Sequence, residues 1–182
     1  LFAVTASFLG QLEISTSLWG TLYLKDVLNV DPKTLGATFL SVFFLFFAVA
    51  RLLSGFFIEK VGYVRTEKLA VAGSILIMLL GFFLGEHGIW VLAASGFTIA
   101  IMWPTLLSII SRAFSQNAPV FMSMILSMCG VISIFMQFFT GWINQNIGPQ
   151  WGYRYLLIPG TIGLILFTYL IRYLKKKNYS VD

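Results

Sequence analysis

Long apolar stretches alternate with short polar segments along the whole chain. Each stretch has about 20 residues or more, and a helix of that length, rising about 1.5 Å per residue, crosses the ~30 Å hydrocarbon layer of a membrane. The stretches are continuously apolar, which favours helices over the alternating strands of a membrane barrel. The pattern predicts an all-α membrane protein whose six transmembrane helices cover approximately residues 1–24, 35–58, 67–85, 88–113, 118–144 and 153–174.

Composition supports a membrane protein and excludes an ordinary soluble domain. Hydrophobic residues make up 58% of the 182 residues, and charged residues only 10%. A soluble domain of this size would lack the polar surface needed to cover so much apolar material. We therefore expect a multi-pass integral membrane protein in contact with membrane lipid.

Basic residues are unevenly divided between the loops on the two sides of the predicted bundle. One side holds Lys25, Lys33 and Arg154, and Arg51 lies inside a stretch. The other side holds the remaining eight of the twelve: Lys60, Arg65, Lys68, Arg112, Arg172, Lys175, Lys176 and Lys177. Because Lys and Arg are retained on the cytoplasmic side, this second side is predicted to be cytoplasmic. The net charge of +5 then comes mostly from basic residues at the cytoplasmic surface of the membrane, and it indicates no nucleic-acid partner.

A charged turn flanked by glycines joins the second and third stretches. From Gly55 to Arg65 it reads Gly-Phe-Phe-Ile-Glu-Lys-Val-Gly-Tyr-Val-Arg. This segment resembles the signature loop of the major facilitator superfamily, Gly-x-x-x-Asp-Arg/Lys-x-Gly followed by basic residues, with Glu59 in place of the usual Asp. The resemblance implies a gate built from Gly55, Glu59, Lys60, Gly62 and Arg65, in which a charged contact of Glu59 breaks in the inward-open state.

The resemblance spans essentially the whole chain and implies half of a larger fold. Members of the family contain two six-helix halves that are parallel repeats. Leu1 is not an initiator Met, and the first stretch lacks the charged start and cleavage site of a signal peptide. We therefore expect one domain, residues 1–182, to be the carboxyl-terminal half of a twelve-helix transporter. Its partner would be the amino-terminal six-helix half of the same protein.

Three shorter matches resemble the sugar permeases related to fucose and glucose:proton symporters. Glu13 precedes Tyr23-Leu24 by ten residues, as a Glu does in that group, although Gln11 replaces the group's glycine. The other two matches are Met102-Trp103-Pro104-Thr105 in the fourth stretch and Tyr155 before Pro159 in the last. These matches imply proton-driven sugar transport.

Two charged residues away from the ends of the predicted spans are the candidates for charges inside the membrane, where a charge at mid-depth costs about 2.5 to 3.5 kcal/mol on insertion scales. Glu13 is near the middle of the first span, and reversible protonation there would couple transport to protons. Its alternatives are a Glu satisfied by neighbouring hydroxyls, or a solute-binding group that never titrates. Arg51 is predicted close to the cytoplasmic rim, where it snorkels or pairs with Glu59 or a carbonyl. Direct contact with an anionic substrate is the alternative for Arg51.

Several polar or aromatic residues at mid-depth are candidates for solute binding. Sugars are bound by hydrogen bonds from amides and hydroxyls and by packing of aromatic rings on the apolar face of the sugar. Packing between helices is the competing interpretation for each candidate, and Trp142, Trp151, Tyr153 and Tyr155 are assigned instead to an interfacial belt. Together with Glu13, the solute-binding candidates are Gln11, Ser15, Trp19, Trp103, Thr105 and Gln137.

The sequence contains no constellation typical of an enzyme. It has a single histidine, His87, and a single cysteine, Cys129, and neither has a partner cluster. No zinc motif, phosphate-binding glycine loop or nucleophile elbow is present, so we expect no catalysis and no metal or other cofactor.

We expect a secondary transporter that moves a small polar solute by alternating access, in the favoured version a sugar together with a proton. The cytoplasmic (inner) membrane of a bacterium is the expected location. An organic-anion or drug carrier is the alternative within transport, and Arg51 would suit it. A passive channel and a non-transporting membrane subunit are alternatives of other classes. A channel should show a polar stripe along several helices, whereas polar residues here are scattered.

Overall fold

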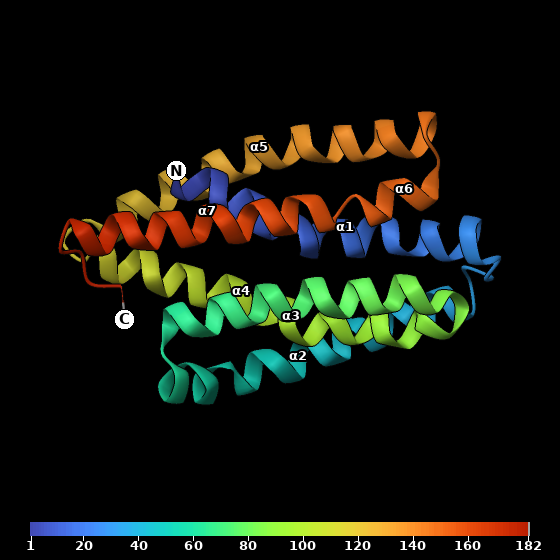
Figure 1. Ribbon diagram of the computed structural model, residues 1–182, viewed down its shortest axis with the longest axis horizontal. Coiled ribbons are helices and arrows are strands. Elements are labelled where there is room, and N and C mark those ends of the chain that lie inside the picture. The colour runs from blue at the N-terminus through green and yellow to red at the C-terminus, as the bar shows by residue number, and fades with distance from the viewer. Residues whose placement is uncertain (182) are drawn as a thin grey trace.

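The computed structural model describes residues 1–181, and all regular structure in that range is helical (Figure 1). Short loops connect the long helices, so neighbours in the chain run back and forth along one axis (Figure 1). The elements are α1 (Phe2–Leu28), α2 (Leu35–Val61), α3 (Tyr63–Leu84), η1 (Gly85–Gly88), α4 (Ile89–Ala113), α5 (Ala118–Asn146), α6 (Pro149–Arg154) and α7 (Leu157–Lys176).

Four helical segments are long and apolar enough to cross a membrane: Leu35–Val61, Tyr63–Ala113, Ala118–Asn146 and Pro149–Lys176. The second of these contains both α3 and α4, which pack side by side and are joined by the 3₁₀ turn η1. Helix α1 is not among the four, and it is the helix that carries the polar candidates Gln11, Glu13 and Ser15. A helical membrane protein is therefore confirmed, while the count of six crossings stays a prediction.

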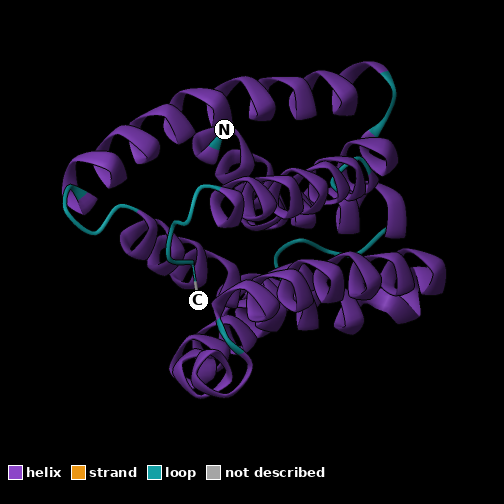
Figure 2. Cartoon of the chain, turned by 60° about the vertical axis from the view of Figure 1, so that its left-hand side comes forward, coloured by secondary structure: helices purple, strands orange, loops and turns teal. Residues whose placement is uncertain are grey.

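The helices form two adjoining groups (Figure 2). Helices α2, α3 and α4 pack together, while α1 contacts α5, α6 and α7. One buried cluster lies where the groups meet and includes Tyr23, Phe39, Phe43, Met78 and Leu92. A second cluster includes Phe2, Ile110, Phe167, Ile171 and Leu174. Helix α1, which carries several functional candidates, belongs to the second group and also touches α2 and α4 of the first.

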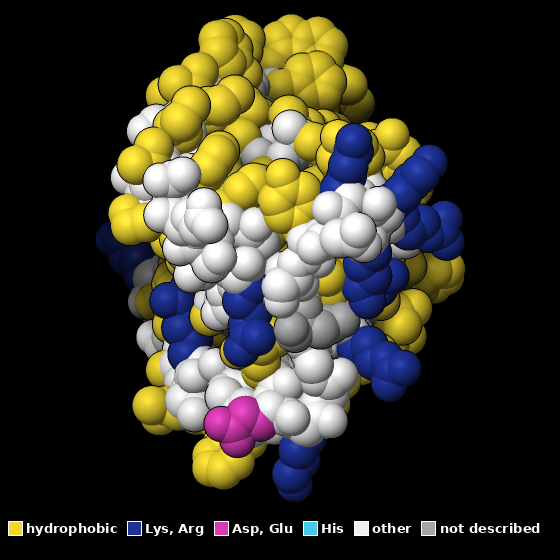
Figure 3. Space-filling model, turned by 90° about the vertical axis from the view of Figure 1, so that its left-hand side faces the viewer, with side chains coloured by type: hydrophobic (Ala, Val, Ile, Leu, Met, Phe, Trp, Pro, Cys, Tyr) yellow, Lys and Arg dark blue, Asp and Glu magenta, His cyan; other side chains and the backbone are white. Residues whose placement is uncertain are grey.

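Lys and Arg side chains gather at one end of the bundle (Figure 3). This end, called here the basic end, contains the turn between α2 and α3 and the last residues of α7. Gly62 is the single residue between α2 and α3, with φ of +87°, a conformation that a residue with a Cβ adopts only with strain. The sharp reversal of the chain there therefore depends on glycine.

The last apolar stretch differs from its predicted form. The structure divides it into α6 and α7, and Tyr153 near the end of α6 is buried, with 1% of its surface exposed. Its ring lies 5.1 Å from the ring of Tyr23 and 5.4 Å from that of Phe82, measured between centroids. The assignment of Tyr153 to an interfacial belt was therefore wrong, because the residue packs in the core. Trp151 is half exposed.

Helices α2 and α4 approach each other most closely at Gly96. A Cβ built on Gly96 would overlap the backbone carbonyl oxygen of Phe43, and backbone cannot move aside as a flexible side chain can. Small residues permit this kind of close contact between membrane helices. Gly96 therefore sets the spacing between α2 and α4.

We predict that Gly96→Ala destabilises the protein by about 1 to 3 kcal/mol, because the added methyl group forces α2 away from α4. Gly130→Ala is the matched control, since Gly130 is also within a helix but has no atom within 4 Å of the position of an added Cβ. Thermal unfolding in detergent measures the effect. Equal melting temperatures for the two variants would contradict the prediction.

Candidate functional site

A hydrogen-bonded chain of three side chains joins the middle of α1 to α5. The indole Nε1 of Trp19 donates to Oε1 of Gln137 over 2.7 Å, and Nε2 of Gln137 donates to the hydroxyl of Ser15 over 2.9 Å. Gln137 is more than 100 residues from both partners in the sequence. The structure thus brings together three of the solute-binding candidates.

Gln11 lies on the same side of α1, deeper in the contact with α5. Its Nε2 donates to the hydroxyl of Thr140 over 3.4 Å, and that hydroxyl donates to the carbonyl of Met136 over 2.9 Å. Gln11 and Ser15 are fully buried, whereas Trp19 and Gln137 are partly exposed. Gln11 and Ser15 therefore hold the two helices together, while Trp19 and Gln137 keep part of their surface exposed.

Glu13 points away from this chain, toward a small cavity between α1, α3 and α4. The cavity holds about 10 Å³, roughly the space that one water molecule needs. Glu13, Glu67 and Trp103 all line it. The structure therefore joins two more candidates, Glu13 and Trp103, with a second carboxyl group that was not expected.

Glu67 is fully buried, and within the described residues neither of its carboxyl oxygens has a hydrogen-bond partner. Sequence reasoning missed it because it stands at the predicted start of the third span, beside Lys68, where a charge looks like part of a loop. The helix begins four residues earlier, at Tyr63, so Glu67 lies in its second turn. The signal was available: Glu67, Val71, Ser74 and Met78 recur at spacings of four, three and four residues, and all are buried.

Arg51 lies deeper in the bundle than its predicted place at the cytoplasmic rim. It is three residues past Ala48, the middle residue of α2, and Glu13 is two residues before Ser15, the middle residue of α1. The guanidinium of Arg51 lies 4.6 Å from the ring centroid of Phe47. In the part of the chain that the structure describes, no ion pair joins Arg51 to Glu59.

The residues of the charged turn lie at the basic end, apart from the sites just described. Gly55, Glu59, Lys60 and Arg65 are exposed, and Gly62 forms the reversal between α2 and α3. Arg65 also lines a cavity of about 420 Å³ together with Lys68 and Lys175. The turn can therefore contribute to a gate but not to solute contact at mid-depth.

Thr105 belongs neither to the hydrogen-bonded chain nor to the lining of the cavity with Glu13 and Glu67. It is fully buried, and its hydroxyl donates to the carbonyl of Ile101 in its own helix over 2.7 Å. The described residues contain no group of three or more His, Cys, Asp or Glu side chains that could hold a metal ion. The arrangement as a whole consists of protonatable, hydrogen-bonding and aromatic side chains between helices, without a set of residues suited to covalent catalysis.

Comparison with known families agrees with this arrangement. The model of the Major Facilitator Superfamily matches residues 1–180, nearly the whole chain. A comparison with curated proteins gives no match. Proteins of this family are multi-pass membrane transporters that bind small-molecule solutes and are not enzymes. The chain therefore belongs to the Major Facilitator Superfamily of secondary transporters.

Proposed function

We propose that this chain is the carboxyl-terminal six-helix half of a proton-coupled symporter for a small polar solute, in the favoured version a sugar. The two halves would bind the solute between them and expose it alternately to each side of the membrane. The uneven distribution of basic residues favours the basic end as cytoplasmic and supports a bacterial inner-membrane location.

The observation that carries proton coupling is that Glu13 and Glu67 line one cavity inside the bundle. A charged carboxylate at mid-depth is costly, so a carboxyl group there is stabilised by binding a proton, unless a cation compensates its charge. Glu13 is partly exposed, whereas Glu67 is fully buried without a hydrogen-bond partner among the described residues. The two carboxyl groups therefore differ in environment, as expected if one takes up the proton and the other holds it.

Solute contact is assigned to Trp19, Gln137 and Trp103. All three are partly exposed, and Trp19 and Gln137 are already oriented by their mutual hydrogen bond. An amide beside an indole ring offers hydrogen bonds for sugar hydroxyls and an aromatic face for the sugar ring. Trp103 adds a second ring next to the carboxyl cavity, which would link solute binding to proton binding.

An organic-anion carrier is the second candidate, and Arg51 favours it. Its side chain is exposed in this chain and lies near the middle of α2, where a cation can face a transport path between two halves. In that case an anionic solute would pair with the guanidinium. Sugars and anions are therefore compared in the experiment.

We predict that Glu13→Gln and Glu67→Gln each abolish solute-driven proton entry. The amide group of glutamine cannot take up and release a proton as a carboxyl group does. The full-length protein is reconstituted in proteoliposomes, and internal pH is followed on adding L-fucose, D-glucose, D-galactose or organic anions. Glu86→Gln, an exposed change in η1, is the control and should acidify like the wild type.

Exchange of labelled solute across the same membranes tests whether the variants still fold and bind. Exchange needs no net proton movement, so both variants should retain it. Acidification that survives in both variants would contradict proton coupling through this cavity. A response to anions alone, lost in Arg51→Gln, would replace the sugar assignment by the anion carrier.

Trp19→Phe is predicted to raise KM for the transported solute by about 2- to 10-fold. The ring remains, but the donor that orients Gln137 is lost, and one such hydrogen bond contributes about 0.5 to 1.5 kcal/mol. Trp90→Phe, an exposed change at the start of α4, is the control. Initial uptake rates measure the effect, and an unchanged KM would remove Trp19 from the solute site.

Gly62→Ala is predicted to slow transport and to destabilise the protein by about 1 to 3 kcal/mol, because alanine is strained at a φ of +87°. Gly55→Ala distinguishes a role in gating from a steric clash, because a Cβ added at Gly55 meets no atom within 4 Å. Uptake rate and thermal stability are measured for both. If Gly55→Ala also slows uptake without loss of stability, the loop acts in gating. Wild-type uptake in both variants would contradict a gate role.

A further inference from the structure

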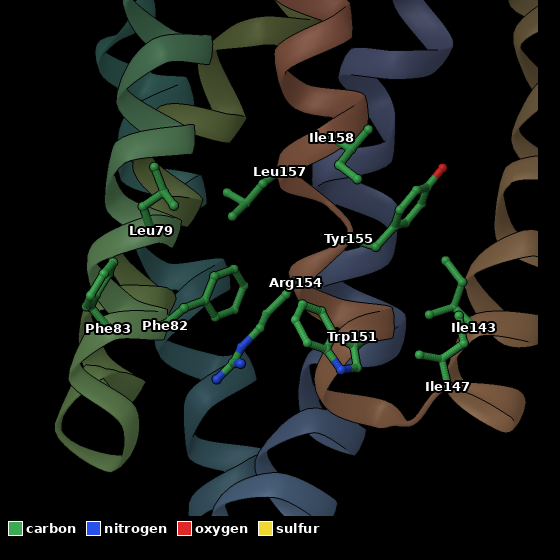
Figure 4. A pocket seen from close by; sticks show the side chains of 10 residues that line it. All are labelled: Leu79, Phe82, Phe83, Ile143, Ile147, Trp151, Arg154, Tyr155, Leu157 and Ile158. Carbon is green, nitrogen blue, oxygen red and sulfur yellow. The ribbon is translucent and has the colours of Figure 1, made fainter.

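A large cavity lies at the end of the bundle opposite the basic end. It holds about 690 Å³ between α3, α5, α6 and the start of α7 (Figure 4). Its walls are almost entirely apolar and include Leu79 and Phe82 from α3 and Ile143 from α5. Such a cavity suits a ligand that is mostly hydrocarbon.

One charged side chain, Arg154, lines this cavity. Its aliphatic stem passes between Phe82 and Trp151, and its guanidinium extends beyond Phe82 at the edge of the lining (Figure 4), 6.0 Å from the ring centroid of Trp151. The Nε atom of Arg154 is buried, and within the described residues it has no hydrogen-bond partner. No Asp or Glu lines the cavity. The cavity thus offers a positive charge without a protein counter-charge.

The rim of the cavity is apolar and exposed in this chain. Phe83 is 90% exposed, and Trp151 and Ile158 are about half exposed, so large apolar side chains surround the opening. On a membrane protein, exposed side chains of this kind suit contact with lipid tails, and Trp and Tyr are enriched where helices meet lipid head groups. Trp151 and Tyr155 both line the cavity. The opening therefore suits a ligand that comes from the bilayer.

We propose that this cavity binds a phospholipid with an anionic head group. The guanidinium of Arg154 forms paired hydrogen bonds with the phosphate, a geometry for which arginine is well suited. One acyl chain lies along Phe82, Leu79 and Ile158. The net negative charge of the lipid matters because Arg154 is the only charged group in the lining, so a zwitterionic head group gains less from it.

The test is lipid competition on the purified full-length protein, read by native mass spectrometry. Palmitoyl-oleoyl phosphatidylglycerol and the phosphatidylcholine of the same chains are offered at equal concentration. The wild type is expected to retain at least about 5-fold more phosphatidylglycerol. Arg154→Gln is expected to lose that preference and Arg154→Lys to keep part of it. Lys33→Gln, which removes an exposed charge outside the cavity, is expected to keep all of it.

Several outcomes would overturn the proposal. Equal binding of the two lipids by the wild type would do so without any variant, and so would an unchanged preference in Arg154→Gln. Displacement of phosphatidylglycerol by oleate at equal concentration would assign the cavity to a fatty acid. Displacement by inorganic phosphate at equal concentration would assign it to a soluble anion. If Lys33→Gln lost the preference for phosphatidylglycerol as fully as Arg154→Gln, the preference would come from general surface charge and not from a specific site.

Discussion

Lipid provides no hydrogen-bond partners, so each polar group on these helices either finds a partner inside the protein or stays available for a ligand. Hydroxyl groups solve this locally: Ser7 and Thr105 each donate to a carbonyl four residues earlier in the same helix, over 2.7 Å. The amides of Gln11 and Gln137 instead find their partners across the contact between α1 and α5. This demand accounts for the packing of α1, a helix rich in polar residues, against α5.

The same constraint separates groups that hold the structure together from groups that can act. The amide nitrogen of Gln11 and the hydroxyl of Ser15 are buried and paired, whereas Glu67 is buried without a hydrogen-bond partner among the described residues. A buried carboxyl group of this kind contributes nothing to stability that an apolar residue would not supply better. It lies with Glu13 on a cavity about the size of one water molecule, which is why proton movement is the role proposed for it.

Charge is also arranged along the length of the bundle. One end carries most of the basic residues around the turn at Gly62 (Figure 3). The opposite end has few, and among them Arg154 lines an apolar cavity. The basic end therefore presents many exposed charges, whereas the cavity at the opposite end has a single charged side chain in its lining. That cavity is separate from the small one that Glu13 and Glu67 line.

The sequence by itself determined the helical class, the positions of the helices within a few residues and the loop that identifies the family, because hydropathy and turn residues act locally. It also gave Ser15, Trp19 and Gln137 as candidates, although not that Gln137 bonds to the other two. Only the tertiary structure decided that Gln11 and Ser15 are buried in the contact between α1 and α5, that Tyr153 is in the core, and that Glu13 shares a cavity with Glu67. Glu67 was missed for the same reason: whether a charge near a helix end is buried depends on what packs over it. In this bundle those partners come from helices far away in the sequence, which local patterns do not encode.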